Sequence, residues 1–248
     1  MRILRVPPHR IWLAGLLAFA CFTSADEERK TATFRVQVGA LGSNTTPTSR
    51  KPRDVSNIVI WLKPLDFSTT KAVVPAKRHP QVVQKNKTFE PHLLVVPAGS
   101  TVDFPNHDPF FHNVFSLFDG KRFDLGLYES GAVNSVHFDK PGISFLFCNI
   151  HPEMNAVIVA VDSPYFGVSD KTGGVSIPDI PQGRFELHVW DERSSPESLR
   201  HLTRTIEISS SSNKLETIVI PESQEPPMNH KDIYGQDYAP PADPYIPH

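Results

Sequence analysis

Residues 143–161 read ISFLFCNIHPEMNAVIVAV, and this stretch predicts two short strands joined by a compact loop. Residues 143–148 and 156–161 are apolar runs rich in aromatic and β-branched side chains, which are typical of buried strands. The loop between them spaces Cys148, His151 and Met154 three residues apart. Because so short a loop returns the chain at once, the three side chains can point toward one centre at one pole of a sandwich.

The rest of the chain has the same β-rich pattern. Short segments with strand character recur about every ten residues, and Pro and Gly mark nearly every junction between them. Beyond the first 25 residues, no segment of a dozen residues has a helical period. We therefore expect an all-β protein built as an antiparallel sandwich or barrel. The further strand segments are residues 34–38, 57–62, 81–84, 93–96, 101–104 and 133–138.

The first 25 residues have the features of an export signal. Three arginines precede an apolar run at residues 11–22. This run is shorter than the roughly 20 residues that a membrane span needs. We expect cleavage after Ala25; the alternative is lipidation of Cys21, because Ala18-Phe19-Ala20-Cys21 loosely resembles a lipobox. No later segment is long and apolar enough to anchor the chain, so we expect a periplasmic or secreted protein.

Charge and cysteine content narrow the function further. Removal of residues 1–25 takes away three arginines and no acid, so the net charge of −2 becomes about −5. The remaining chain has no cluster of Lys and Arg, which argues against a nucleic-acid partner. Cys148 is then the single remaining cysteine and cannot form an intramolecular disulfide. A lone thiol in an oxidising compartment is prone to oxidation unless it is buried or bound to a metal.

The spacing of soft ligands predicts a copper site. Thiolate, imidazole and thioether groups select copper over magnesium or calcium. A blue-copper site needs a second histidine, and His112 in Phe111-His112-Asn113-Val114 is the candidate, expected on a loop at the same pole. His107 is the rival, but it lacks the following Asn-Val. Four protein ligands leave no position for a substrate, so the pattern favours an electron carrier and not an enzyme.

Residues 78–162 resemble the cupredoxins, the type 1 blue copper proteins of the plastocyanin and amicyanin kind. The ligand loop Cys-x-x-His-x-x-Met is similar in length to that of amicyanin. This resemblance implies a Greek-key sandwich that holds one copper through His112, Cys148, His151 and Met154. It also implies that Asn113 ties the two ligand segments together and that His151 is the ligand at the solvent edge. Further similarity lies in Lys87-Thr88-Phe89-Glu90-Pro91, Gly99-Ser100-Thr101-Val102 and Asn106…His112-Asn113-Val114.

The chain divides by composition into further sections. Residues 26–77 hold two strands and a Ser/Thr/Pro-rich loop, and residues 222–248 form a proline-rich tail. Residues 163–221 resemble the carboxypeptidase regulatory-like (transthyretin-like) modules, which implies a second small β-sandwich without chemistry of its own. That fold usually has more strands than this section supplies. Two arrangements are open: residues 163–221 fold alone, or residues 31–66 complete their sheets and residues 78–162 are an insertion.

The leading hypothesis is an exported, methylamine-utilisation-like copper protein that carries single electrons between redox partners. A cytochrome, an oxidase or a dehydrogenase would be such a partner. Two alternatives remain open: a copper-binding or copper-delivery protein without an electron-transfer role, and a cell-surface structural β-module. Phe110 and Phe111 have two interpretations as well, as core residues or as an apolar docking patch beside His151.

Overall fold

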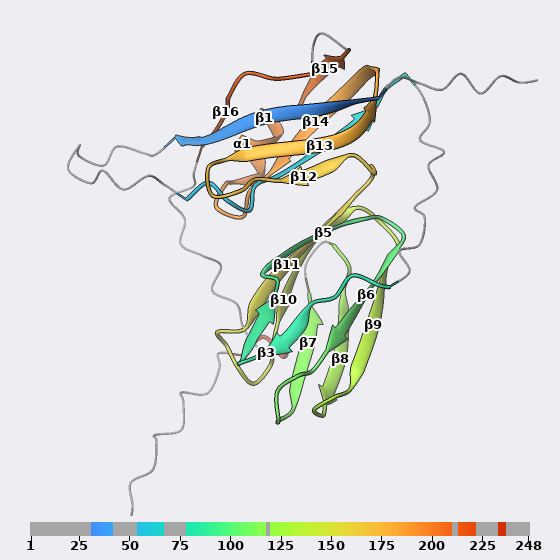
Figure 1. Ribbon diagram of the computed structural model, residues 1–248. Coiled ribbons are helices and arrows are strands. Elements are labelled where there is room, and N and C mark those ends of the chain that lie inside the picture. The colour runs from blue at the N-terminus through green and yellow to red at the C-terminus, as the bar shows by residue number, and fades with distance from the viewer. Residues whose placement is uncertain are drawn as a thin grey trace, which may run out of the picture.

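The computed structural model describes residues 31–41, 54–66, 78–117, 120–209, 213–221 and 233–236. These residues form strands throughout and one short helix, so the expected all-β class is confirmed. Two bodies lie one above the other (Figure 1). Among the described residues, no helix has the length and apolar character needed to cross a membrane. The expected export signal at residues 1–25 lies outside the described residues.

The lower body, which we call the inserted sandwich, is formed by consecutive strands. Its largest sheet has the strand order β5-β11-β10-β7-β8. Two separate two-stranded sheets, β6-β9 and β3-β4, complete the sandwich. Apolar side chains from these sheets enclose a common core. Its strands are β3 (Val83–Lys85), β4 (Thr88–Glu90), β5 (Leu93–Pro97), β6 (Ser100–Pro105), β7 (His112–Ser116), β8 (Phe123–Tyr128), β9 (Val133–Phe138), β10 (Gly142–Phe147) and β11 (Asn155–Val161).

The upper body, the flanking sandwich, combines strands from both ends of the chain. They are β1 (Thr31–Leu41), β2 (Val59–Pro64), β12 (Phe166–Val168), β13 (Gly174–Pro181), β14 (Gly183–Trp190), β15 (Arg204–Ile208) and β16 (Ile218–Pro221), with helix α1 (Pro196–Arg200). Its sheets have the orders β13-β1-β16 and β12-β2-β14-β15. Because β1 pairs with β13 and β2 pairs with β14, the early and late segments share both sheets. Strands β3–β11 lie between β2 and β12 in the chain.

Two strand pairs depart from the expected antiparallel pattern. Strand β11 pairs in parallel with β5, and β1 pairs in parallel with β16. Parallel neighbours need a long connection, and in both pairs several other strands separate the two partners along the chain. The remaining named pairs of the described residues are antiparallel, such as β10 with β11 and β6 with β9.

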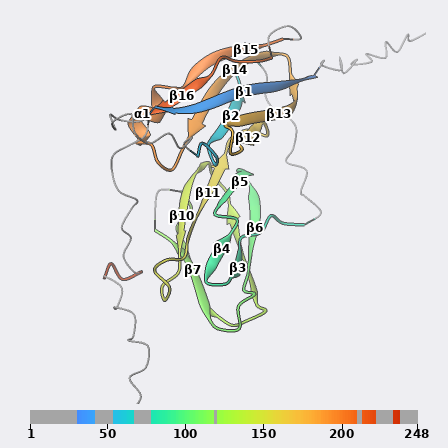
Figure 2. The same cartoon turned by 60° about the vertical axis from the view of Figure 1, so that its left-hand side comes forward.

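Strand β11 is buried on both faces, and this joins the two bodies. Its even-numbered side chains, from Ala156 to Ala160, lie in the core of the inserted sandwich. Its odd-numbered side chains, from Val157 to Val161, lie in a separate apolar cluster that we call the seam. Strands β2 and β12 lie against the upper ends of β5 and β11 in both views (Figures 1 and 2). The seam consists of Val59, Val157, Val159 and Val161, with Trp61, Leu93, Val95, Ile143, Phe145, Phe166 and Trp190 packed against it.

The structure corrects one expectation about local structure. His112 was expected on a loop, but it is the first residue of β7, and Asn113 follows it in the same strand. Every residue of β7 is buried, so the strand lacks the alternation of apolar and polar side chains that reveals a half-buried strand. Its pairing with β8 also contains a register shift between Asn113 and Phe115.

Candidate metal centre

Three ligand side chains converge at the lower pole of the inserted sandwich. Cys148 directly follows β10, His112 opens β7, and His151 lies in the loop before β11. The Nδ1 atoms of His112 and His151 each lie 3.8 Å from Cys148 Sγ. The three ligand atoms all lie within 4.8 Å of one another. Since β7 and β10 are neighbours in one sheet, the fold itself brings His112 to the cysteine loop.

These separations fit one shared metal ion. Bonds of about 2.3 Å to a thiolate and about 2.0 Å to an imidazole, opened to roughly 120°, put sulfur and nitrogen about 3.7 Å apart. The observed distances of 3.8 Å match this value. A thiolate with two imidazoles is the trigonal set of blue-copper proteins, so the cluster is consistent with a type 1 copper site.

The loop from Cys148 to Met154 is closed by its own backbone. The N–H of Met154 donates to the carbonyl of His151 at 3.0 Å, and the N–H of Cys148 donates to the carbonyl of Met154 at 3.3 Å. These bonds bring the two ends of the loop together where β10 and β11 begin to pair, at Phe147 and Asn155. The Met154 side chain is fully buried in the same core cluster as Cys148.

Asn113 connects the two segments that carry the ligands. Its Oδ1 accepts a hydrogen bond from the N–H of Asn149 at 2.8 Å, next to Cys148. Its Nδ2 donates to the carboxylate of Asp124 in β8 at 2.7 Å. The Oδ1 of Asn149 in turn accepts from the N–H of Ile233 at 3.0 Å. A described piece of the C-terminal segment, residues 233–236, therefore contacts this loop.

Asp108 belongs to the site although sequence reasoning did not identify it. Its carboxylate accepts a hydrogen bond from His112 Nε2 at 2.8 Å and is almost fully buried. Burial acts to raise the pKa of Asp108, but hydrogen bonds from Lys87, His112 and Asn86 outweigh it, so the pKa lies below its usual range. An acid four residues before a candidate ligand was the only sequence signal. A carboxylate behind a metal-binding histidine is a common arrangement.

His151 lies at the edge of the site. It is partly exposed, whereas His112 and Cys148 are fully buried. Burial, followed by the neighbouring His112, lowers the pKa of His151. The ring of Phe110 contacts the rings of both histidines, with centroid distances of 5.1 Å to His112 and 5.7 Å to His151. The rival His107 is exposed and is not part of the ligand cluster.

Comparison with known proteins gives matches among solved structures alone. No protein-family model matches the chain, and the search of curated proteins gives no match either. The copper-containing nitrite reductase of Thermus scotoductus SA-01 is 26% identical, with a TM-score of 0.34, over 41% of this chain and 26% of its own. A purple cupredoxin of Nitrosopumilus maritimus is 22% identical, with a TM-score of 0.30, over 33% of this chain and 99% of its own. A reduced mutant of amicyanin is 22% identical, with a TM-score of 0.33, over 35% of this chain and 85% of its own.

These likenesses concern the fold alone. The chain spans about a quarter of the nitrite reductase that it matches, and the match covers less than half of this chain.

Proposed function

We propose that this protein is a type 1 copper protein that carries single electrons. The observation that supports this most strongly is the placement of His112 Nδ1 and His151 Nδ1, each 3.8 Å from the sulfur of Cys148. Met154, buried beside Cys148, supplies a weak fourth ligand in this proposal. Copper bound to such a set supplies a one-electron couple between Cu(II) and Cu(I).

The chain's own residues suit electron transfer better than catalysis. His112, Cys148 and Met154 are fully buried, so water and substrate are kept away from them. The two backbone hydrogen bonds of the loop and the Asn113–Asn149 link hold the ligands in place, which keeps rearrangement small when the charge changes. Of the four ligands only His151 is partly exposed, so it offers electrons the shortest path to the surface.

A redox partner would dock around His151. Phe110, whose ring contacts that of His151, and Ile150, the residue before it, expose 37% and 47% of their surface. Phe111, the chain neighbour of Phe110, exposes 55%. Aromatic and aliphatic side chains that are exposed together commonly mark an interaction surface. We propose a cytochrome, an oxidase or a dehydrogenase as the partner, met in the periplasm or outside the cell after cleavage behind Ala25.

Titration of the metal-free protein with Cu(II) tests the proposed function. We expect one copper per chain, an intense thiolate-to-copper absorption band, and fast, reversible bleaching on reduction. Copper binding without that band, or with slow reduction, would favour a copper-delivery protein. Absence of copper binding would leave the structural β-module.

Three variants make the titration specific. Cys148→Ser removes the thiolate, so the absorption band should disappear entirely. His112→Ala should also abolish the band, whereas the matched change His107→Ala, at an exposed histidine five residues earlier, should leave it intact. An unchanged band in His112→Ala would overturn the assignment of this ligand.

A further inference from the structure

The carboxylate of Asp108 is held by donors from two separate segments. Its Oδ1 accepts from the N–H of Asn86 at 2.6 Å, and its Oδ2 accepts from the N–H of Lys87 at 2.9 Å. Oδ2 also accepts from His112 Nε2 at 2.8 Å. Because only 4% of Asp108 is exposed, these N–H groups take the place of water around the charge.

The two backbone donors come from an unusual turn. Asn86 and Lys87 form the two-residue connection between β3 and β4, with φ angles of 54° and 55°. Both values lie in the left-handed region, which a lysine seldom adopts. A hairpin turn with positive φ at both central residues is a type I′ turn. Here it aims two consecutive N–H groups at one carboxylate, an arrangement that suits an anion.

The bond from His112 to Asp108 determines which ring nitrogen can bind metal. An ionised carboxylate can only accept hydrogen bonds, so His112 must carry its hydrogen on Nε2. In the neutral ring Nδ1 is then bare, and Nδ1 is the atom that lies 3.8 Å from Cys148 Sγ. The negative charge behind the ring also makes Nδ1 a better electron donor.

We propose that Asp108 is a positioning residue that holds His112 in the Nε2–H tautomer and thereby lowers the reduction potential of the bound copper. This inference rests on the proposed copper site. A more basic imidazole stabilises Cu(II) more than Cu(I), so loss of the carboxylate charge raises the potential. Outer partners of this kind typically change metal affinity by about 10–100-fold.

Two substitutions separate the hydrogen bond from the charge. Asp108→Asn keeps an oxygen that can accept from His112 but removes the charge. We expect it to keep the Nε2–H tautomer and to weaken Cu(II) relative to Cu(I) by about tenfold, which raises the potential by about 59 mV. Asp108→Ala removes the acceptor, so the tautomer should become mixed as well.

The control is a second Asp–His pair of the same sandwich. Asp103 contacts His79 Nδ1 at 2.9 Å, and His79 is exposed. Asp103→Asn should therefore change neither the tautomer of His112 nor the potential. This variant reports any general effect of losing an aspartate from the inserted sandwich.

The tautomer is read from the ¹⁵N chemical shifts of His112 in the metal-free, full-length protein, and the potential from redox titration of the copper form. Nε2–H alone in the wild type and in Asp108→Asn, with a mixture in Asp108→Ala, supports the proposal. Nε2–H alone in Asp108→Ala, or an unchanged potential in Asp108→Asn, overturns it. Because the first measurement needs no copper, it stays informative even if the wild type fails the Cu(II) titration.

Discussion

At the scale of single residues, burial assigns the ligands different tasks. His112 and Cys148 are fully buried, whereas His151 is partly exposed. The ligand atoms of the three residues nevertheless all lie within 4.8 Å of one another. The buried pair is shielded from water by the fold, and the edge histidine faces the surface. The same metal set would therefore be dry on one side and accessible on the other.

Replacement of Met154 by Gln tests the fourth ligand. The thioether is a soft and weak ligand, whereas an amide oxygen is harder and stabilises Cu(II). We expect Met154→Gln to keep copper and its absorption band but to lower the reduction potential by at least about 59 mV, a tenfold change in relative affinity. Redox titration measures this. A potential equal to that of the wild type would show that Met154 only fills the core.

Replacement of Asn113 by Ala tests the link between the ligand segments. The N–H of Asn149 and the carboxylate of Asp124 would both lose a partner. Loss of such partially buried hydrogen bonds costs about 1–3 kcal/mol, so the free energy of unfolding should fall by about that amount. Chemical denaturation measures it. Asn155→Ala, at an exposed asparagine of the same loop region, is the control and should have little effect.

At the scale of elements, β11 packs against two different parts of the molecule with alternating side chains. Ile158 lies in the core that also holds Cys148 and Met154, and Val159 faces the flanking sandwich. A strand that is apolar on both faces appears in sequence as one continuous run, as residues 156–161 do. The ligand loop, residues 148–154, ends where β11 begins. The stability of this loop therefore depends on the packing of β11 in the seam.

A charge placed in the seam should uncouple the two sandwiches. Val159→Asp would bury a carboxylate among valines, where no partner offsets its desolvation. We expect the calorimetric unfolding transition to move to lower temperature and to split, because each sandwich keeps its own core. Val219→Asp, at a valine of β16 that is 43% exposed, should leave the transition nearly unchanged. A single transition at the wild-type temperature in Val159→Asp would contradict the role of the seam.

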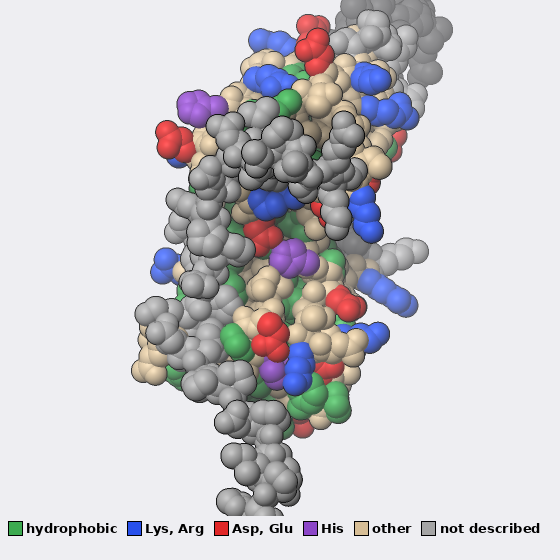
Figure 3. Space-filling model, turned by 90° about the vertical axis from the view of Figure 1, so that its left-hand side faces the viewer, with side chains coloured by type: hydrophobic (Ala, Val, Ile, Leu, Met, Phe, Trp, Pro, Cys, Tyr) green, Lys and Arg blue, Asp and Glu red, His purple; other side chains and the backbone are tan. Residues whose placement is uncertain are grey.

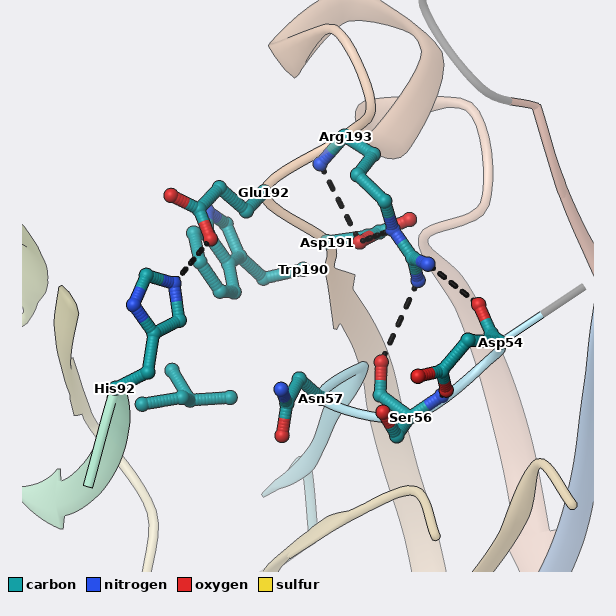
Figure 4. Close-up of a pocket in the computed structure, with 9 residues that line it drawn as sticks. Asp54, Ser56, Asn57, His92, Trp190, Asp191, Glu192 and Arg193 are labelled. Atoms are coloured by element: carbon teal, nitrogen blue, oxygen red, sulfur yellow. Dashed lines mark hydrogen bonds and ion pairs between the residues drawn. The ribbon is translucent and has the colours of Figure 1, made fainter. Parts of the chain in front are cut away.

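At the scale of the whole molecule, polar contacts line the edge of the seam. His92, in the inserted sandwich, bonds through Nε2 to Glu192 of the flanking sandwich at 2.8 Å and through Nδ1 to the carbonyl of Asn155 at 3.3 Å. Figure 4 shows this pair on one side of a pocket of about 160 Å³, with Arg193 bonded to Asp54 and to Ser56 on the other. Acidic, basic and histidine side chains are mixed along the face in Figure 3.

The contact between His92 and Glu192 predicts a pH-dependent stability. The hydrogen bond to Glu192 raises the pKa of His92 above its ordinary value of 6.5. The charged histidine therefore adds stability that is complete below pH 6.5 and is lost as the pH rises through the raised pKa. Because 42% of the His92 side chain and 41% of the Glu192 side chain are exposed, solvent screens the contact and the effect is small.

Thermal unfolding of His92→Gln measures this effect. The midpoint temperature of unfolding should be higher in the wild type than in the variant by roughly 1–3 °C at about pH 6. This difference in midpoint temperature should vanish at about pH 9. His107→Gln, at an exposed histidine, is the control for the loss of a histidine from the inserted sandwich. A constant difference between wild type and His92→Gln at all pH values would rule out the charged contact.

Most of the candidate ligands could be predicted from the sequence because they lie close together along the chain. Cys148, His151 and Met154 lie within seven residues, and the strands beside them are continuous apolar runs. His112 could be selected by its neighbours Asn113 and Val114. Asp108 could not, because nothing in Asn106-His107-Asp108-Pro109 shows that a turn at Asn86 and Lys87 will surround its carboxylate.

The sequence alone determined the all-β class and the ligand loop, since alternation, apolar runs and short spacings are properties of neighbouring residues. Only the tertiary structure decided that β1 and β2 share sheets with β13 and β14, because strand pairing joins segments more than a hundred residues apart. It also decided that His112 opens a buried strand and that Asp108 holds its ring. These features depend on which segments the fold brings together, and no local pattern encodes that.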